Sequence, residues 1–164
     1  MLTTDGYLYL VDRALDGMAT TLTGLGDELV NTRPGLPGAN SPYAIVTHCL
    51  GVMTFWGGQV VAGRDVDRDR EAEFEATGPV EPLLERLRAA RKQFGADVEA
   101  AVPADPPRGV VPPKYRGTPI GETQGVALQH VYEELAQHRG HLDVTRDLLL
   151  ARRVEAGGAA PSLQ

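Results

Sequence analysis

The chain has 164 residues, of which 42% are hydrophobic and 23% are charged, with a net charge of -6 at neutral pH. This composition fits one soluble globular domain that is large enough to bury a core without disulfide bonds. The acidic balance, and the lack of any Lys/Arg cluster with interleaved aromatic residues, argue against a nucleic-acid partner.

Cysteine content and the N-terminal segment predict a cytoplasmic protein. Cys49 is the only cysteine, so no internal disulfide can form and a reducing compartment is expected. The first residues lack the basic and apolar regions of a secretory signal, and purely apolar runs are much shorter than the ~20 residues of a membrane span. We therefore expect no membrane association. The excess of arginine over lysine and the abundant alanine, glycine and valine are typical of a GC-rich genome, such as that of an actinobacterium.

The first predicted helix spans about residues 4–30, where apolar side chains recur at three- and four-residue steps. The residues before it, Thr3 to Asp5, are suitable N-caps. Three glycines weaken this helix and favour a bend: Gly17, Gly24 and Gly26. The proline- and glycine-rich segment 33–38 ends it.

Two further helices are predicted in the middle of the chain. One begins at Ser41-Pro42, a capping residue followed by proline at the first helical position, and ends near Ala62, before Gly63. The other spans about residues 79–101 and carries an apolar stripe. Between them, residues 64–75 are charged with nearly balanced signs, and we predict a solvated loop.

Residues 102–121 contain six prolines, which nearly excludes helix there. A loop of this length inside a domain is either functional, as a lid or binding loop, or a rigid crossover, and both interpretations remain open. The last helix is predicted over residues 122–153. No repeat and no sustained β-alternation is visible, so we predict an all-α domain over residues 1–154 and a disordered Gly/Ala-rich tail over residues 155–164.

Ionisable side chains gather on one face of the last predicted helix. At 100° per residue, His130, His138 and His141 all lie within about 40° of the direction of Glu134. Glu134 and His138, four residues apart, can converge on one metal ion as the two histidines of a zinc-binding helix do. His48, the only other histidine, lies among apolar residues and is predicted to face inward, where bundles build metal sites between facing helices.

The spacing alone also fits a simpler interpretation. A single buried histidine is usually a hydrogen-bonded core residue, and a helix rich in His and Glu can be plain surface. If the three side chains do bind a metal, nitrogen and oxygen ligands of this number leave positions open for water or substrate, as in catalytic zinc sites.

The order of these residues resembles the DinB superfamily. The resemblance rests on His48 with Trp56 eight residues later, and on His130, Glu133-Glu134 and His138-Arg139-Gly140-His141-Leu142-Asp143. It is closest to the DUF664-type branch, related to mycothiol-dependent maleylpyruvate isomerase, and it covers most of the chain in helix order. It implies a four-helix bundle with up-down-down-up topology, and metal ligands at His48, Glu134 and His138. Glutamate replaces a common histidine at position 134, and His141 replaces the usual glutamine.

Several neighbouring side chains are predicted to be structural or solvated rather than functional: Trp56 in the core, Cys49 as a packed thiol, Glu133 as a solvated carboxylate and Arg139 in a surface ion pair. Tyr115 and Arg116, in the proline-rich loop, could reach the mouth of the site, and the sequence does not decide whether they do.

The resemblance implies a metal-dependent thiol S-transferase or isomerase that uses a low-molecular-weight thiol such as mycothiol. A divalent ion, zinc by its ligand types, would stabilise the thiolate form of a thiol whose ordinary pKa is near 8.5. His141 is predicted to be a catalytic proton acceptor or a residue that orients the ligands. Expected partners are the thiol and an electrophile of unknown identity, and a homodimer is compatible. Two alternatives remain: a DinB-like metal-binding protein without thiol transfer, and a metal-dependent hydrolase.

Overall fold

The computed structural model describes residues 3–158, and all regular structure within them is helical. The long elements are α1 (Thr4–Val30), α2 (Pro42–Val52) with its π-helical continuation η1 (Met53–Val61), α4 (Val80–Glu99) and α6 (Gln124–Gly158). The short elements are α3 (Arg70–Glu75), the 3-10 turn η2 (Pro113–Tyr115) and α5 (Pro119–Glu122). The prediction of an all-α fold is confirmed.

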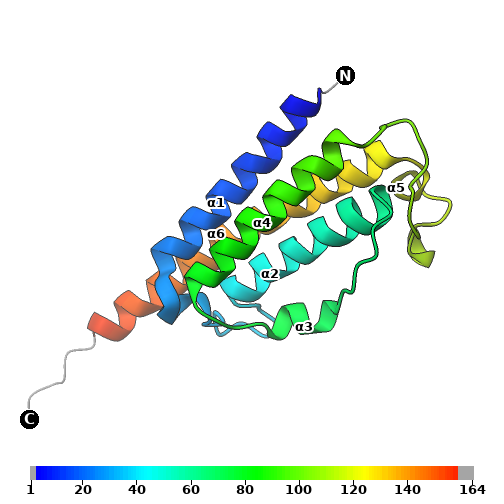
Figure 1. Cartoon of the computed structure of the whole chain (residues 1–164). Coiled ribbons are helices and arrows are strands. Elements are labelled where there is room, and N and C mark those ends of the chain that lie inside the picture. Colours follow the sequence, from blue (N-terminus) through cyan, green and yellow to red (C-terminus); the bar gives the residue numbers. More distant parts are fainter. Residues whose placement is uncertain (1–2, 159–164) are drawn as a thin grey trace, which may run out of the picture.

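The long helices pack lengthwise as a bundle (Figure 1). α1 packs against α4 and α6, and the rod formed by α2 and η1 packs against the same two helices. α1 and α6 run in one direction, whereas α2 and α4 run in the other (Figure 1). α3 lies on the outer side of α2, and the long connection before α6 covers one end of the bundle.

The core is filled by apolar side chains from all four long helices. The largest fully buried ones are Leu15, Met18, Leu22, Ile45, Met53, Leu83, Leu135 and Leu142. Those on α1, α2, η1 and α4 belong to the apolar stripes that the helical periodicity predicts, and the burial of the whole set accounts for the bundle.

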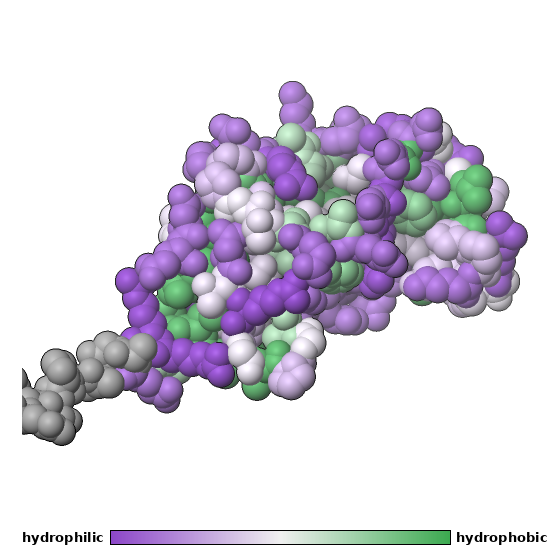
Figure 2. All heavy atoms as spheres, turned by 90° about the horizontal axis from the view of Figure 1, so that it is seen from below, coloured by the Kyte–Doolittle hydropathy of each residue, from purple (hydrophilic) through white to green (hydrophobic). Residues whose placement is uncertain are grey.

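One helical stretch, residues 42–61, is long and apolar enough to cross a membrane by length and composition alone. Its most apolar window is 78% buried inside the bundle, so it is the central core helix of the fold. Figure 2 shows a face of the molecule on which hydrophilic residues predominate and hydrophobic ones are exposed in small, separate groups.

Local signals in the sequence place the start of α1 and both ends of the α2–η1 rod correctly. The side-chain oxygens of Thr3 and Ser41 accept backbone N–H groups in the first turns of α1 and α2, and Pro42 occupies the first position of α2. Gly26, with φ of 66°, interrupts α1 at the predicted bend. Gly63, with φ of 74°, follows η1 in the left-handed conformation that glycine adopts without strain.

The prediction of a solvated loop over residues 64–75 is wrong for residues 70–75, whereas residues 64–69 have no regular structure. Asp69 caps a short helix, α3, because its carboxylate accepts the N–H groups of Glu71 and Ala72 at 3.0 Å each. α3 packs on α2, and Glu73 is only 7% exposed. At least one charged side chain of this segment, that of Glu73, is therefore buried rather than solvated.

The near-exclusion of helix from residues 102–121 is also wrong in two places. η2 and α5 each have proline at the start, where the missing N–H would be unpaired in any case. α6 begins at Gln124 rather than at 122, because Thr123 is extended. α6 also continues to Gly158, so residues 155–158 of the predicted tail are helical. The rest of the predicted tail, 159–164, lies outside the described residues.

Candidate metal centre and adjoining pocket

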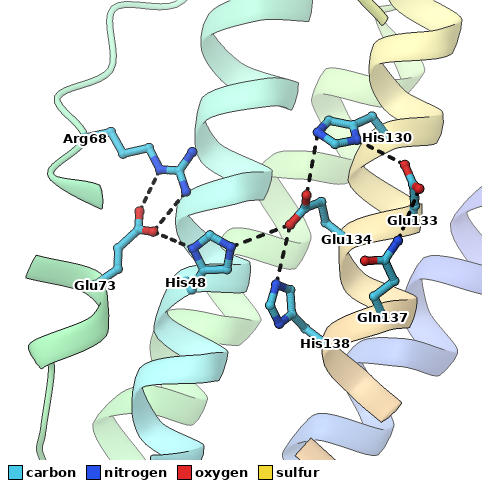
Figure 3. A network of polar contacts seen from close by, with 8 residues as sticks. All are labelled: His48, Arg68, Glu73, His130, Glu133, Glu134, Gln137 and His138. Carbon is cyan, nitrogen blue, oxygen red and sulfur yellow. Dashed lines mark hydrogen bonds and ion pairs between the residues drawn. The ribbon is translucent and has the colours of Figure 1, made fainter. Parts of the chain in front are cut away.

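Three side chains from α2 and α6 converge inside the bundle (Figure 3). His48 projects from α2 and is 3% exposed, while Glu134 and His138 lie one turn apart on α6. One ligand atom from each residue lies within 4.8 Å of the other two. Nε2 of His48 lies 3.6 Å from Oε2 of Glu134, and Nε2 of His138 lies 3.5 Å from the same oxygen. The structure thus brings together the three ligands that the sequence predicts.

These separations suit a shared ion better than direct hydrogen bonds. An N–H···O hydrogen bond in a protein usually spans about 2.7–3.2 Å. Two donors bound to one tetrahedral zinc ion at about 2.0–2.1 Å lie about 3.3–3.4 Å apart. The two separations from Glu134 are therefore close to those between the ligands of one divalent ion, and two imidazoles with one carboxylate are ordinary ligands for zinc.

The charges in this cluster are strongly coupled. The contacts with His138 and His48 outweigh partial burial and hold the pKa of Glu134 far below its ordinary value. Burial alone would lower the pKa of His48, but its contacts with Glu134 and Glu73 outweigh burial and raise it. Glu134 is therefore a carboxylate at neutral pH. A cation at the site competes with the proton on His48.

Glu73 holds His48 from behind, a role that the sequence does not reveal. Its Oε2 lies 2.8 Å from Nδ1 of His48, so the Nδ1–H group can donate to it and Nε2 is left to face Glu134 (Figure 3). Arg68 donates to both Glu73 oxygens, at 2.6 and 2.9 Å. Burial raises the pKa of Glu73, but the hydrogen bonds from His48 and Arg68 outweigh burial and lower it. This is the carboxylate support that metal-binding histidines commonly have.

A glycine on α2 makes room for this support. Gly51 lies one turn after His48, and a β-carbon there would overlap the Glu73 carboxyl group and come within 3.1 Å of Nε of Arg68. A buried histidine needs a partner for its second nitrogen, so a carboxylate could be expected. The connector after η1 offers six acidic candidates, and nothing in their spacing distinguishes one: Asp65, Asp67, Asp69, Glu71, Glu73 and Glu75.

His130 lies beside the three ligands but is held differently. Its Nδ1 lies 3.2 Å from Glu133, and its Nε2 lies 3.7 Å from Oε1 of Glu134. Its ring packs against Trp56 at 4.9 Å and Tyr115 at 5.5 Å between centroids. Glu133 is largely exposed, as predicted, yet it also contacts His130. His130 therefore forms part of the pocket wall.

His141 stands apart from the ligand cluster. It is exposed on the turn of α6 after His138, and the two rings are 6.0 Å apart between centroids. Partial burial, and then the charge of His138, lower its pKa. The ring is therefore neutral at neutral pH and can accept a proton.

The residues predicted to be structural are placed as follows. Cys49 is fully buried, and burial raises the pKa of its thiol. Arg139 pairs with Asp143 at 2.9 Å on the surface of α6. Trp56 is only 4% exposed and belongs to the core, but one side of it also lines the pocket described next.

A cavity of about 300 Å³ adjoins the ligand cluster. His48 and Glu134 line it, and Trp56, Tyr115 and His130 pack against one another to form an aromatic part of its wall. Tyr115 belongs to the proline-rich connection, and its ring packs against Trp56 with centroids 4.9 Å apart. Arg116 does not line the cavity and instead donates to a carbonyl of its own loop.

The base of the proline-rich connection is fastened to α6. Gln124, 1% exposed, accepts the N–H of Val102 at 3.0 Å and donates to the carbonyl of Pro106 at 2.9 Å. The N–H of Gly109 donates to Val60 in η1 at 3.0 Å. The connection is thus a tied crossover that also supplies a wall of the pocket, which combines the two interpretations left open by the sequence.

Comparison with known proteins gives one family and one fold. The sequence model of a family described as mycothiol-S-transferase matches residues 8–151. No curated protein matches the chain. Among solved structures, the crystal structure of a conserved protein from Enterococcus faecalis is similar, with a TM-score of 0.70 and 16% identity. The match covers 92% of this chain and 99% of that one, and at this identity it shows a shared fold alone.

Proposed function

The chain belongs to the mycothiol S-transferase family, and from this we propose that it joins mycothiol, through its thiol sulfur, to a small electrophile with the help of one divalent ion. We assign zinc to the site, with His48, Glu134 and His138 as its protein ligands. The family confirms the resemblance that the sequence motifs suggested, whereas the DUF664-type branch and an actinobacterial source stay predictions.

The observation that carries the proposal is the spacing of three donor atoms beside a pocket. Nε2 of His48 and Nε2 of His138 each lie about one tetrahedral edge from the same Glu134 oxygen, at 3.6 and 3.5 Å. Three ligands leave an open position in a tetrahedral site. The adjoining 300 Å³ cavity is the size of a small-molecule site.

The chemistry divides between the ion and the chain. When bound, a divalent ion supplies positive charge that favours the thiolate over the thiol. Glu134 keeps two neighbouring histidines close, and Glu73 fixes the ring of His48 so that Nε2 faces inward. The pocket beside them holds the electrophile. A carbon–sulfur bond forms as the thiolate donates its electron pair, and the bond to the leaving group breaks with its own pair.

The thiol proton needs an acceptor, and we assign that role to His141. His130 already has Glu133 against its Nδ1 and Glu134 near its Nε2. His141 is exposed and has a lowered pKa, so it can take a proton and release it to water. Its place beyond His138, outside the pocket lining, suits an acceptor on the solvent side.

The proposed chemistry fits a cytoplasmic protein, because a thiol substrate stays reduced there and the single cysteine of this chain is buried away from oxidants. The partners are then two small molecules, the thiol and the electrophile.

The test is a conjugation assay with the zinc-loaded protein, mycothiol and monochlorobimane, whose thioether is fluorescent. We expect conjugate formation that stops after chelation, returns with zinc, and is lost in His48→Ala. Glu133→Gln serves as the matched control, because it removes a neighbouring carboxylate without touching the ligands. Full metal binding without any conjugate would instead indicate a metal-binding protein that does not transfer thiols.

A further inference from the structure

The pocket beside the ligand cluster carries an excess of positive charge. Three basic side chains line it: Arg68, Arg70 and Lys114. The chain as a whole has a net charge of -6, so a pocket with more basic than acidic side chains is opposite in sign to the protein. The acidic residue among the lining side chains is Glu134, whose charge is assigned to the metal.

Two of these cations are not neutralised by the protein. Arg68 is paired with Glu73 through two hydrogen bonds. Arg70 and Lys114 form no ion pair with any residue in the described range 3–158. Instead, the Arg70 guanidinium lies 5.2 Å from the Phe74 ring centroid, and Nζ of Lys114 lies 4.5 Å from that of Tyr115.

Contact with an aromatic face positions a cation without neutralising it. Arg70 and Lys114 are both exposed, so an incoming anion pays a smaller desolvation cost there than it would against a buried charge. They come from separate segments, α3 and η2, and meet at one cavity. The cavity therefore offers an anion two cations at its rim and aromatic surface beside them.

We propose that the electrophilic substrate is an anion, an apolar or aromatic body that carries a carboxylate, and that Arg70 and Lys114 bind its carboxylate. The inference rests on the proposed function. Mycothiol has no carboxylate of its own, because its cysteine carboxyl group is tied up in an amide, so the negative charge has to belong to the electrophile.

A binding test needs no turnover. Trp56 is the single tryptophan of the chain and lines the cavity, so quenching of its fluorescence reports occupancy. The probes are 3,5-dinitrobenzoate and the neutral 3,5-dinitrobenzamide, which have nearly the same shape, each titrated into the zinc-loaded protein without thiol. We expect the benzoate to bind more tightly, and Arg70→Gln or Lys114→Gln to weaken its binding up to about five-fold each, as exposed ion pairs do.

The controls separate this site from general electrostatics. Lys92→Gln removes the other lysine, which is exposed on α4 and does not line the cavity. This variant should bind both probes as tightly as the wild-type protein does. The double variant Arg70→Gln/Lys114→Gln should bind the two probes equally, with amide binding unchanged. Equal binding of the two probes by the wild-type protein, or a benzoate preference that survives in the double variant, would overturn the proposal.

A second arm separates this proposal from the proposed function. With mycothiol, 4-chloro-3,5-dinitrobenzoate and its amide accept the thiolate at the ring carbon as chloride leaves. We expect kcat/KM to favour the benzoate in the wild-type protein, and the double variant to lose only that preference. A fluorescence preference for the benzoate with no conjugation of either compound would support the anion subsite and overturn the thiol transfer.

Discussion

Two regions meet at His48, and they position side chains in different ways. α6 presents Glu134 and His138 from adjacent turns of a 35-residue helix, so the helix geometry sets their separation. α3 has six residues and presents Glu73 from the outside of the bundle, where the hydrogen bonds of Arg68 and the space left by Gly51 decide its place. α6 supplies two of the three proposed metal ligands, and the contact with α3 sets which nitrogen of His48 faces them.

This difference has a consequence for the free energy of metal binding. Removing a donor on the α6 side removes a bond to the ion, whereas a change on the α3 side leaves every donor in place and loosens one of them. The two regions should therefore differ in the size of their effects on metal affinity.

The largest effect is expected on the α6 side, from Glu134→Gln. A neutral amide replaces the anionic ligand, and we expect zinc affinity to fall by more than about 100-fold, beyond the usual cost of losing an outer support. Glu133→Gln, one residue earlier on the exposed face, should change affinity little. Competition titration with a chromophoric chelator measures both, and equal losses in the two variants would mean that the wrong carboxylate is assigned.

A smaller effect is expected on the α3 side, from Glu73→Gln. The variant keeps all three ligands but weakens the hold on Nδ1 of His48, and we expect zinc affinity to fall about 10- to 100-fold. Gly51→Ala should act in the same direction, because its methyl group displaces the Glu73 carboxyl group. Unchanged affinity in both variants, with the helical circular dichroism retained, would show that α3 does not support the site.

The pH dependence of zinc binding involves both regions, because both contact His48. The pKa of His48 is raised by Glu134 and Glu73, so the proton on His48 stabilises the metal-free protein. That stability is fully present below the ordinary histidine pKa of about 6.5 and is lost as pH rises through the raised value. Zinc needs the neutral ring, so its affinity should fall about ten-fold per pH unit below the raised pKa. In Glu73→Gln the decrease in zinc affinity should begin at a lower pH than in the wild-type protein. Zinc titrations at several pH values measure this. A zinc affinity that does not change with pH would show that proton and zinc binding at His48 are not coupled.

The smallest effect on metal binding is expected from His141→Gln, at the far end of the α6 cluster. His141 does not join the ligand atoms, so zinc content should stay near one per chain while the rate of thiol conjugation falls several-fold, within the usual range for proton transfer. Loss of zinc would make His141 a ligand. An unchanged rate at every pH would make it a bystander.

The sequence predicted that Glu134 and His138 share one face of α6, and it did so for a physical reason. Positions 134 and 138 share a helix face whatever the rest of the fold does, and the apolar surroundings of His48 forced it inward. The same periodicity gave the core stripes, and proline, serine and glycine marked most helix ends.

The α3 side could not be predicted, because Glu73 reaches His48 through a tertiary contact between residues 25 positions apart. Its connector has no periodicity, and its burial depends on a gap at Gly51 that no local pattern shows. The place of Tyr115 in the pocket wall could not be predicted either, because it depends on the tertiary hydrogen bonds by which Gln124 holds the proline-rich connection.

The most direct test of the central claim is X-ray absorption spectroscopy of the zinc-loaded protein, before and after mycothiol is added. We expect a shell of nitrogen and oxygen ligands at about 2.0–2.1 Å, to which mycothiol adds one sulfur at about 2.3 Å. Cys49→Ala should give the same spectra, because the buried Cys49 thiol is not a ligand. A zinc–sulfur distance already present without mycothiol, or none after its addition, would show that the ion does not bind the thiol of mycothiol at a site of nitrogen and oxygen ligands.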